Sequence, residues 1–355
     1  MNPIAYTRAE GIEDALVALG QPSESSTALN EARFIAGGTN LTDLMKVNVM
    51  RPARLVDINR LELTSIEPLD DGGIKLGALA RNADTAYHPI VRSRYPLLSS
   101  AILAGASPQI RNMATNGGNL LQRTRCYYFY DHATPCNKRA PGSGCSAIGG
   151  LTRQHAILGA SAQCIATHPS DMCVALAALD ATVHVISHRG PRAIAFTDFH
   201  RLPGDRPDLD ATLRQDELIT HIALPDANRF AKHSVYIKLR DRLSYAFALV
   251  SVAVALDLDE GGSIREARIA LGGVSHKPWR IPDAEALLAG ARPGAEALDR
   301  AADALLQGAI GQGGNDFKIP LARRAIVRAL KVAYAGTVTN LRHDRDPDEE
   351  GRSHD

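Results

Sequence analysis

The chain has 355 residues, of which 45% are hydrophobic and 22% are charged, so it can bury a substantial core in two or three domains. Its 40 basic and 39 acidic residues give a net charge of +1, which offers no electrostatic reason to expect a nucleic-acid or anionic-membrane partner. The longest nearly uncharged apolar run, residues 245–256, is too short to cross a bilayer, and the first 20 residues lack the pattern of a secretory signal.

The first half of the chain predicts short strands that alternate with helices. We expect strands at 33–38, 54–59 and 73–80, and helices near 11–19, 81–92 and 95–105. From about residue 217 the pattern changes to longer alternating strands and then to helices, expected at 217–225, 233–240, 248–259 and 263–274, and near 283–291, 294–309 and 319–337. A second domain is therefore expected to begin near residue 227, and the charged end of the chain is expected to be disordered.

The sequence contains two Gly-Gly pairs that lie beside strand-like or helix-like runs. In "IAGGTNL" (35–41), a tight loop could turn backbone N–H groups toward an anion, although an ordinary turn explains a lone Gly-Gly pair as well. "QIRNMATNGGNLLQ" (109–122) repeats the pattern, and two such loops could hold one diphosphate from two sides. Neither segment has the spacing of a Rossmann nicotinamide site or of a P-loop.

All five cysteines lie between residues 126 and 173. They are too few, and odd in number, for a disulfide scaffold, so their clustering asks for a local explanation such as a metal site. The CxxC spacing that usually marks structural zinc is absent. Spacing alone therefore favours neither zinc nor an iron-sulfur cluster.

Four segments in this order, "AGGTNLTDLMK", "QIRNMATNGGNL", "HPSDMCVALAALDATV" and "GGVSHKPWR", resemble the FAD-binding subunit of the molybdenum hydroxylase (xanthine dehydrogenase) family. The resemblance implies an α+β protein. It has a vanillyl-alcohol-oxidase-like (PCMH-type) FAD-binding domain of two α/β subdomains, and a C-terminal α+β domain of the CO dehydrogenase flavoprotein type. The implied bounds are 1–226 (subdomains about 1–58 and 59–226), 227–337, and a charged tail, 338–355.

About fifty residues separate Leu120 from Asp171, where most such subunits have a short connection. A minority of the family carry a 4Fe-4S cluster in an insertion at this place, among them the 4-hydroxybenzoyl-CoA reductases and the bacterial periplasmic aldehyde oxidoreductases. Residues 121–165 resemble the aldehyde oxidoreductases more closely. Cys173 lies just after Asp171, an expected helix N-cap, so we expect it to be a small buried side chain and not a cluster ligand. It stays the alternative ligand. The implied cluster ligands are Cys126, Cys136, Cys145 and Cys164, with the aromatic run 127–130 either shielding the cluster or packing the loop.

The resemblance also implies the residues that contact FAD. Asp171 matches a polar contact, and Lys238 matches a lysine near the flavin ring, although a lysine on an alternating strand is as readily explained as solvated. Asn116 stands where the family often has an apolar residue beside the isoalloxazine. The histidines show no ligand spacing and receive no role. The two loops that match those holding the pyrophosphate are Ala36, Gly37, Gly38, Thr39, Asn40 and Leu41, and Thr115, Asn116, Gly117, Gly118 and Asn119.

The resemblance implies that this chain passes electrons through FAD to a terminal acceptor and has no catalytic residue of its own. A large molybdenum-cofactor subunit oxidises an aldehyde, and electrons pass through 2Fe-2S clusters on a small subunit to FAD on this chain. The close relatives are exported by a signal on the small subunit, so we expect a periplasmic location, with the cytoplasm as the alternative. Two other hypotheses remain: a stand-alone flavin oxidoreductase with zinc at the cysteines, and a structural subunit without FAD.

Overall fold

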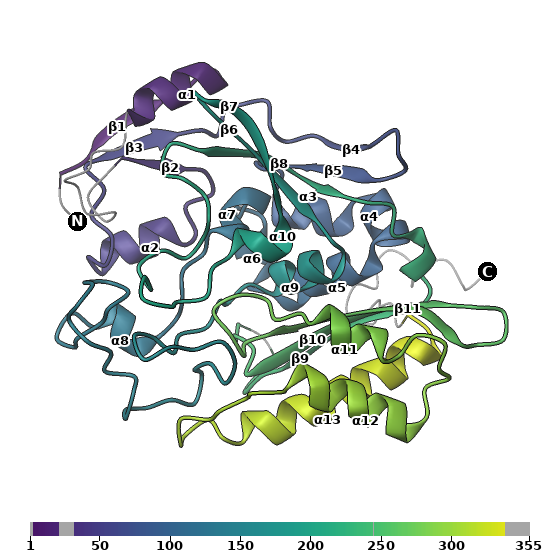
Figure 1. Ribbon diagram of the computed structural model, residues 1–355. Helices are drawn as coiled ribbons and strands as arrows, with labels where there is room; N and C mark the ends of the chain where they lie inside the picture. The colour runs from purple at the N-terminus through teal and green to yellow at the C-terminus, as the bar shows by residue number, and fades with distance from the viewer. Residues whose placement is uncertain (1–2, 21–31, 244, 338–355) are drawn as a thin grey trace, which may run out of the picture.

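The computed structural model describes residues 3–20, 32–243 and 245–337, so the expected disordered tail lies outside the described residues. Within these ranges the chain folds around three sheets (Figure 1). The first sheet is parallel, with the order β1-β3-β2, and its core includes Leu16 and Val56. Its elements are β1 (Ala5–Arg8), α1 (Ile12–Leu19), β2 (Arg33–Ile35), α2 (Leu41–Lys46) and β3 (Arg54–Asp57).

The second sheet has five antiparallel strands in the order β4-β5-β8-β6-β7. These strands are β4 (Ile66–Pro68), β5 (Ile74–Gly77), β6 (Thr182–Ser187), β7 (Gly190–Ala195) and β8 (Leu218–Leu224). The helices packed with them are α3 (Asn82–Tyr87), α4 (Pro89–Arg94), α5 (Pro96–Ala104), α9 (Asp171–Ala178) and α10 (Phe196–Phe199). The single helix expected at 81–92 is wrong. His88 is extended because it precedes Pro89, and this divides the segment into α3 and α4.

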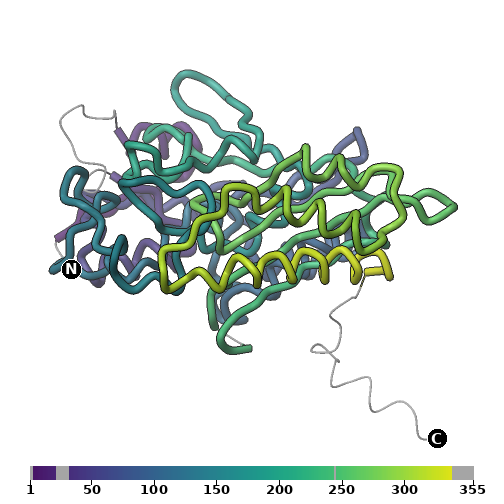
Figure 2. Tube along the Cα trace, turned by 60° about the horizontal axis from the view of Figure 1, so that its bottom comes forward, coloured from purple at the N-terminus to yellow at the C-terminus, as the bar shows by residue number. Residues whose placement is uncertain are grey.

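The third sheet is antiparallel, with the order β11-β10-β9, and is followed by three helices. These elements are β9 (Ser234–Leu239), β10 (Val250–Leu258), β11 (Ile264–Gly272), α11 (Pro282–Ala286), α12 (Ala295–Leu305) and α13 (Lys318–Ala335), after a 3₁₀ turn at Asn228–Phe230. In Figure 2, α12 and α13 run side by side along the outside of this unit.

Strand β10 joins the two halves of the protein because both of its faces are buried. Val252 and Val254 pack in the core that includes α12 and α13, whereas Ala253 and Ala255 pack in the core that includes α5 and α9. Successive side chains of a strand point to opposite faces, so an uninterrupted apolar run suits this position. The long strands expected from residue 217 onward are thereby confirmed.

The segment 121–165 forms a loop-rich lobe at one end of the molecule, next to α2 (Figure 1). Its one described helix is α8 (Tyr127–Tyr130), and short bridges pair Cys136 with Cys145 and Ser161 with Cys164. Two other short helices, α6 (Pro108–Arg111) and α7 (Asn116–Leu120), lie in the glycine segment that precedes this lobe. None of the helices in the described ranges is long and apolar enough to cross a membrane.

Candidate functional site

The two glycine loops meet at one cleft between the first and second sheets. This cleft has a volume of about 340 Å³, and residues 36–41 line it together with Thr115, Gly117 and Gly118. Gly37 lies so close to the second loop that a Cβ built on it would be 1.9 Å from the carbonyl oxygen of Met113. The two Gly-Gly loops thus line the same cleft.

Local hydrogen bonds fix the shape of both loops. The Thr115 hydroxyl accepts a bond from the backbone N–H of Gly118 at 3.2 Å and so caps α7. In the first loop, Gly38 has φ of +70°, a conformation that a glycine adopts at little cost. Asn40 ties this loop to the start of the insertion, because its Oδ1 accepts a bond from the Arg123 N–H at 2.9 Å.

Asn116 does not line the cleft, although it lies between residues that do. Its side chain is fully buried and bonds to Thr85, to the Gly77 carbonyl oxygen and to Asn82 at 2.9 to 3.2 Å. Every polar atom of the amide therefore has a partner inside the protein. The carboxamide of Asn116 joins α7 to α3 and β5, and it does not contribute to the lining of the cleft.

Asp171 and Lys238 form a buried ion pair beside a smaller hollow. Lys238 Nζ lies 2.7 Å from Asp171 Oδ2, and the side chains are 4% and 7% exposed. Tyr236 donates a bond to the other carboxylate oxygen at 2.6 Å. Asp171 lines the hollow, together with Cys126 and Phe247, and the pair is separate from the residues that line the larger cleft. The reading of Lys238 as a solvated strand residue is therefore wrong.

The start of α9 connects this pair to the second glycine loop. Asp171 is the first helical residue and not the expected N-cap, because Ser170 occupies the cap and its hydroxyl accepts a bond from the Cys173 N–H. The same hydroxyl donates to Asn119 Oδ1 at 2.6 Å. Asn119 therefore holds the helix start against the loop, a link that its position in "NGGNL" does not reveal.

Four cysteines line one small pocket in the insertion, and the fifth lies elsewhere. The pocket contains Cys126, Cys136, Cys145 and Cys164, whereas Cys173 is fully buried on α9. Tyr128 and Phe129 line the same pocket, so half of the aromatic run shields it and Tyr127 remains 48% exposed. The structure thus brings together the four cysteines that the resemblance implies and separates Cys173 from them.

Backbone N–H groups point at the sulfur atoms of this pocket. Cys126 accepts bonds from Phe129 and Tyr128, and Cys145 accepts them from Ile148 and Ala147. Such bonds favour a thiolate, but burial has the opposite effect and raises the pKa of the Cys126 thiol to about 11.

Two of the four thiols interact directly with each other. The Cys164 thiol donates a hydrogen bond to Cys145, which lowers the pKa of Cys145 and raises the pKa of Cys164. Four thiolates in so buried a space would require a bound cation to compensate their charge. The donor set therefore suits a thiophilic metal or an iron-sulfur cluster.

Ion pairs anchor the insertion to the loop that contains Asp210. Lys138 is 2% exposed and lines the cysteine pocket, and its Nζ lies 2.5 Å from Asp210. Arg123 binds the other oxygen of the same carboxylate at 2.7 Å, and together they hold the pKa of Asp210 well below its usual range despite burial. A positive charge thus lies beside the cysteines, and its counter-ion belongs to the loop that lines the large cleft.

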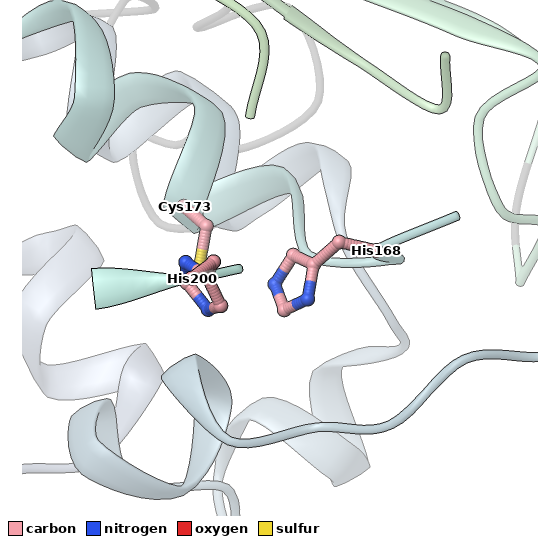
Figure 3. A group of neighbouring side chains, drawn as sticks. All are labelled: His168, Cys173 and His200. Atoms are coloured by element: carbon pink, nitrogen blue, oxygen red, sulfur yellow. The ribbon is translucent and has the colours of Figure 1, made fainter. Parts of the chain in front are cut away.

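Cys173 belongs to a second group, with the half-buried His168 and the buried His200 (Figure 3). Their ligand-type atoms all lie within 4.8 Å of one another, and the two imidazole rings pack with centroids 4.2 Å apart. Burial lowers the pKa of both histidines, that of His200 to about 4. His200 Nε2 bonds to the Leu120 carbonyl oxygen at 2.8 Å, which fixes a neutral ring with its proton on Nε2.

We expect these neutral rings to make the fold sensitive to acid. An unfolded histidine takes up a proton near pH 6.5, whereas His200 in the fold does so only near pH 4, so this contribution to stability is complete above pH 6.5 and is lost as the pH falls toward 4. When the pH falls from 7 to 5, the unfolding free energy of the wild type should fall by about 2 kcal/mol more than that of His200→Gln, as measured by urea denaturation. The same change at exposed His132 should not alter the loss, and an equal loss in His200→Gln would contradict the interpretation.

Comparison with known proteins agrees with this geometry. Residues 2–227 match the family described as the FAD binding domain in molybdopterin dehydrogenase, and residues 234–333 match the CO dehydrogenase flavoprotein C-terminal domain. The chain is 52% identical over 305 residues to the aldehyde oxidoreductase FAD-binding subunit PaoB of Escherichia coli, covering 86% of this chain and 92% of that one. It is 29% identical to the glyceraldehyde dehydrogenase medium chain of Sulfolobus acidocaldarius, with 79% of each covered.

The fold has a counterpart among solved structures. A chain of carbon monoxide dehydrogenase from Hydrogenophaga pseudoflava superposes with a TM-score of 0.72 at 26% identity, covering 94% of this chain and 99% of that one. The α+β fold class and the family resemblance are confirmed. The chain belongs to the FAD-binding subunits of the molybdopterin dehydrogenase (molybdenum hydroxylase) family.

Proposed function

We propose that this chain is the FAD- and 4Fe-4S-containing electron-transfer subunit of a heteromeric molybdenum aldehyde oxidoreductase. The observation that carries the proposal is the cleft of about 340 Å³, which the two glycine loops line together and where Gly37 lies against the second loop. The 52% identity to an aldehyde oxidoreductase FAD-binding subunit supports the substrate class. The expected partners are a large molybdenum-cofactor subunit and a small 2Fe-2S subunit.

The residues of the cleft would bind and orient the cofactor. Residues 36–41 and Thr115–Asn119 would hold the pyrophosphate of FAD. The N–H groups of Asn116, Gly117 and Asn119 already donate to Ala80, Ala78 and Thr115, so the first loop would supply most of the backbone donors. Arg123 and Arg214 line the same cleft, each paired with a carboxylate there. When bound, FAD collects electrons one at a time and releases them singly or in pairs, and an iron-sulfur cluster transfers single electrons. The Asp171–Lys238 pair would position the polar side of the flavin from the neighbouring hollow.

The four-cysteine pocket would hold the 4Fe-4S cluster. Cys126, Cys136, Cys145 and Cys164 supply the required four sulfur ligands, and backbone N–H groups already point at the sulfurs of Cys126 and Cys145. Burial among Phe129 and other lining residues would limit water around the cluster. Zinc bound by the same four cysteines is the alternative, and it would make the insertion structural.

Replacing one cysteine tests the cluster. We expect the complex, purified without oxygen, to contain one FAD and about four irons on this chain, with a four-iron signal in the reduced electron paramagnetic resonance spectrum. Cys126→Ser should lose that signal and its iron but keep the FAD, because the residues proposed to hold the pyrophosphate do not line the pocket. Cys173→Ala, the matched control outside the pocket, should keep all three. One zinc and no iron would contradict the cluster and leave the flavoprotein assignment standing.

Activity of the isolated chain tests the partners. An electron-transfer subunit should neither oxidise nor reduce aldehydes by itself, and it should regain electron input when the molybdenum and 2Fe-2S subunits are added. Aldehyde oxidation by the lone flavin-loaded chain would favour the stand-alone oxidoreductase. We also propose a periplasmic location, reached together with a signal-bearing partner. Cell fractionation with and without that partner measures this, and a chain found only in the cytoplasm would contradict it.

A further inference from the structure

A histidine without a role in the sequence analysis touches the four-cysteine pocket. His155 Nε2 lies 3.1 Å from Cys126 Sγ, and the residue is 2% exposed. The ring also packs near that of Tyr128, with centroids 6.5 Å apart. This contact differs from the two N–H bonds at the Cys126 sulfur because it comes from a side chain, 29 residues further along the chain, and not from the backbone next to the cysteine.

The chemistry of the sulfur assigns the proton in this contact. A cysteine that ligates a cluster is a thiolate, which accepts hydrogen bonds and has none to donate. Nε2 must then carry the proton and donate to Cys126 Sγ. Nδ1 of the same ring is buried and has no hydrogen-bond partner in the described part of the chain. No hydrogen bond at Nδ1 therefore holds the ring in a different orientation.

The C-terminal unit holds the backbone of His155 in place. Its carbonyl oxygen accepts one bond from Lys318 Nζ at 2.8 Å and another from Asn315 Nδ2 at 3.0 Å. Lys318 is fully buried at the start of α13 and also donates to the Gly273 carbonyl oxygen. The backbone of His155 is therefore anchored to the C-terminal unit, and burial of the side chain leaves its imidazole little freedom to move away from Cys126.

We propose that His155 raises the reduction potential of the group held by the four cysteines, by donating the Nε2 hydrogen to Cys126 Sγ and fixing its position. The inference rests on the proposed 4Fe-4S cluster. Reduction adds negative charge that spreads onto the sulfur ligands, so a donor to one of them stabilises the reduced state more than the oxidised state. His155 is a positioning residue, since its expected effect is exerted through Cys126.

The test compares the potentials of three proteins, each as the whole complex. The cluster in the wild type, His155→Leu and His155→Gln is titrated anaerobically while its electron paramagnetic resonance signal is followed. His155→Leu should shift the midpoint to a more negative value, with the reduced fraction falling about tenfold at fixed potential, the equivalent of 59 mV for one electron. His155→Gln retains an N–H donor and should stay nearer to the wild type. His132→Leu, an exposed histidine of the same insertion, serves as the control and should not shift it.

Each outcome separates this inference from the proposed cluster. A wild type that contains no iron refutes the cluster, and the inference fails with it. Iron-loaded variants with an unchanged midpoint overturn the role of His155 and leave the cluster intact. Loss of iron in His155→Leu but not in His155→Gln supports the positioning role, because the donor then rescues assembly. Loss of iron in both variants overturns the inference, since the imidazole would then be needed for something other than its N–H bond.

Discussion

Gly37→Ala is expected to yield a chain that folds less stably and no longer retains flavin. The new Cβ would lie 1.9 Å from the Met113 carbonyl oxygen and 2.8 Å from its carbon, so one of the two loops must move. The second loop cannot move easily, because hydrogen bonds hold it in position. Arg81 donates to the Met113 carbonyl oxygen at 2.7 Å, and the Asn82 N–H donates to the Ala114 carbonyl oxygen at 2.8 Å. The strain should therefore open the cleft that both loops line.

The size of the effect follows from overpacking. Inserting a methyl group into a packed contact typically costs about 1 to 3 kcal/mol of unfolding free energy. The flavin should respond more strongly, because a cofactor held between two loops loses its binding geometry when the loops separate. The ratio of flavin absorbance to polypeptide after gel filtration should fall from about one to near zero, while circular dichroism shows a folded chain.

Gly11→Ala is the matched control for this prediction. Gly11 precedes α1 in the same domain and has an extended backbone with φ of −148°. A Cβ added there would meet no atom within 4 Å among the described residues beyond its chain neighbours. The substitution should therefore leave the flavin content near the wild-type value and cost at most about 1 kcal/mol, because alanine is a poorer N-cap for α1 than glycine. A Gly37→Ala protein that keeps a full complement of flavin would show that the two loops do not grip the pyrophosphate as we propose.

The fold was largely predictable where one periodic pattern dominates a long segment. The strands from residue 217 onward alternate clearly or are apolar throughout, and β8 to β11 lie where they are expected. Strands β6 and β7 were not predicted, although the burial of β6 alternates strictly over Thr182–Ser187. This strand carries His184 on its less buried face, opposite His221 of β8. The alternation of buried and exposed residues is therefore harder to recognise in the sequence than in the folded sheet.

The candidate site was predictable only in its backbone parts. Glycine pairs point to close approach, and Gly37 shows why the residue must lack a side chain. The directions of side chains were not predictable, because they depend on contacts between distant segments. Asn116 turns inward to Thr85, and His155 reaches a cysteine 29 residues away. Nothing in the local sequence around His155 distinguishes it from a histidine that merely packs in the interior.

Lys238→Met is expected to destabilise the chain more than any loss of a surface ion pair. The substitution would leave the Asp171 carboxylate buried with Tyr236 as its remaining side-chain donor. Removing one partner from a buried pair typically costs about 3 to 5 kcal/mol, because the other charge is stranded away from water. The Ala104 carbonyl oxygen also loses a donor, although Arg240 still bonds to it at 3.0 Å. Guanidinium denaturation of the wild type and variant measures the difference.

Lys75→Met provides a control with the same chemistry and the same distance. Its Nζ also lies 2.7 Å from a carboxylate, that of Glu67, but the two side chains are 33% and 49% exposed. Water can replace the lost partner there, so the cost should stay below about 1 kcal/mol. A similar cost for the two variants would mean that burial of the Asp171–Lys238 pair does not determine its contribution.

The double variant Lys238→Met with Asp171→Asn separates a stranded charge from lost packing. Asparagine is close to aspartate in size, and its carbonyl oxygen can still accept the bond from Tyr236, so most of the stability lost in Lys238→Met should return. Flavin content distinguishes stability from function in the same samples. If the pair positions the flavin, the double variant should be stable yet retain less FAD than the wild type, because neither charge then faces the hollow that Asp171 lines. A stable double variant with full FAD content would assign the pair to the fold alone.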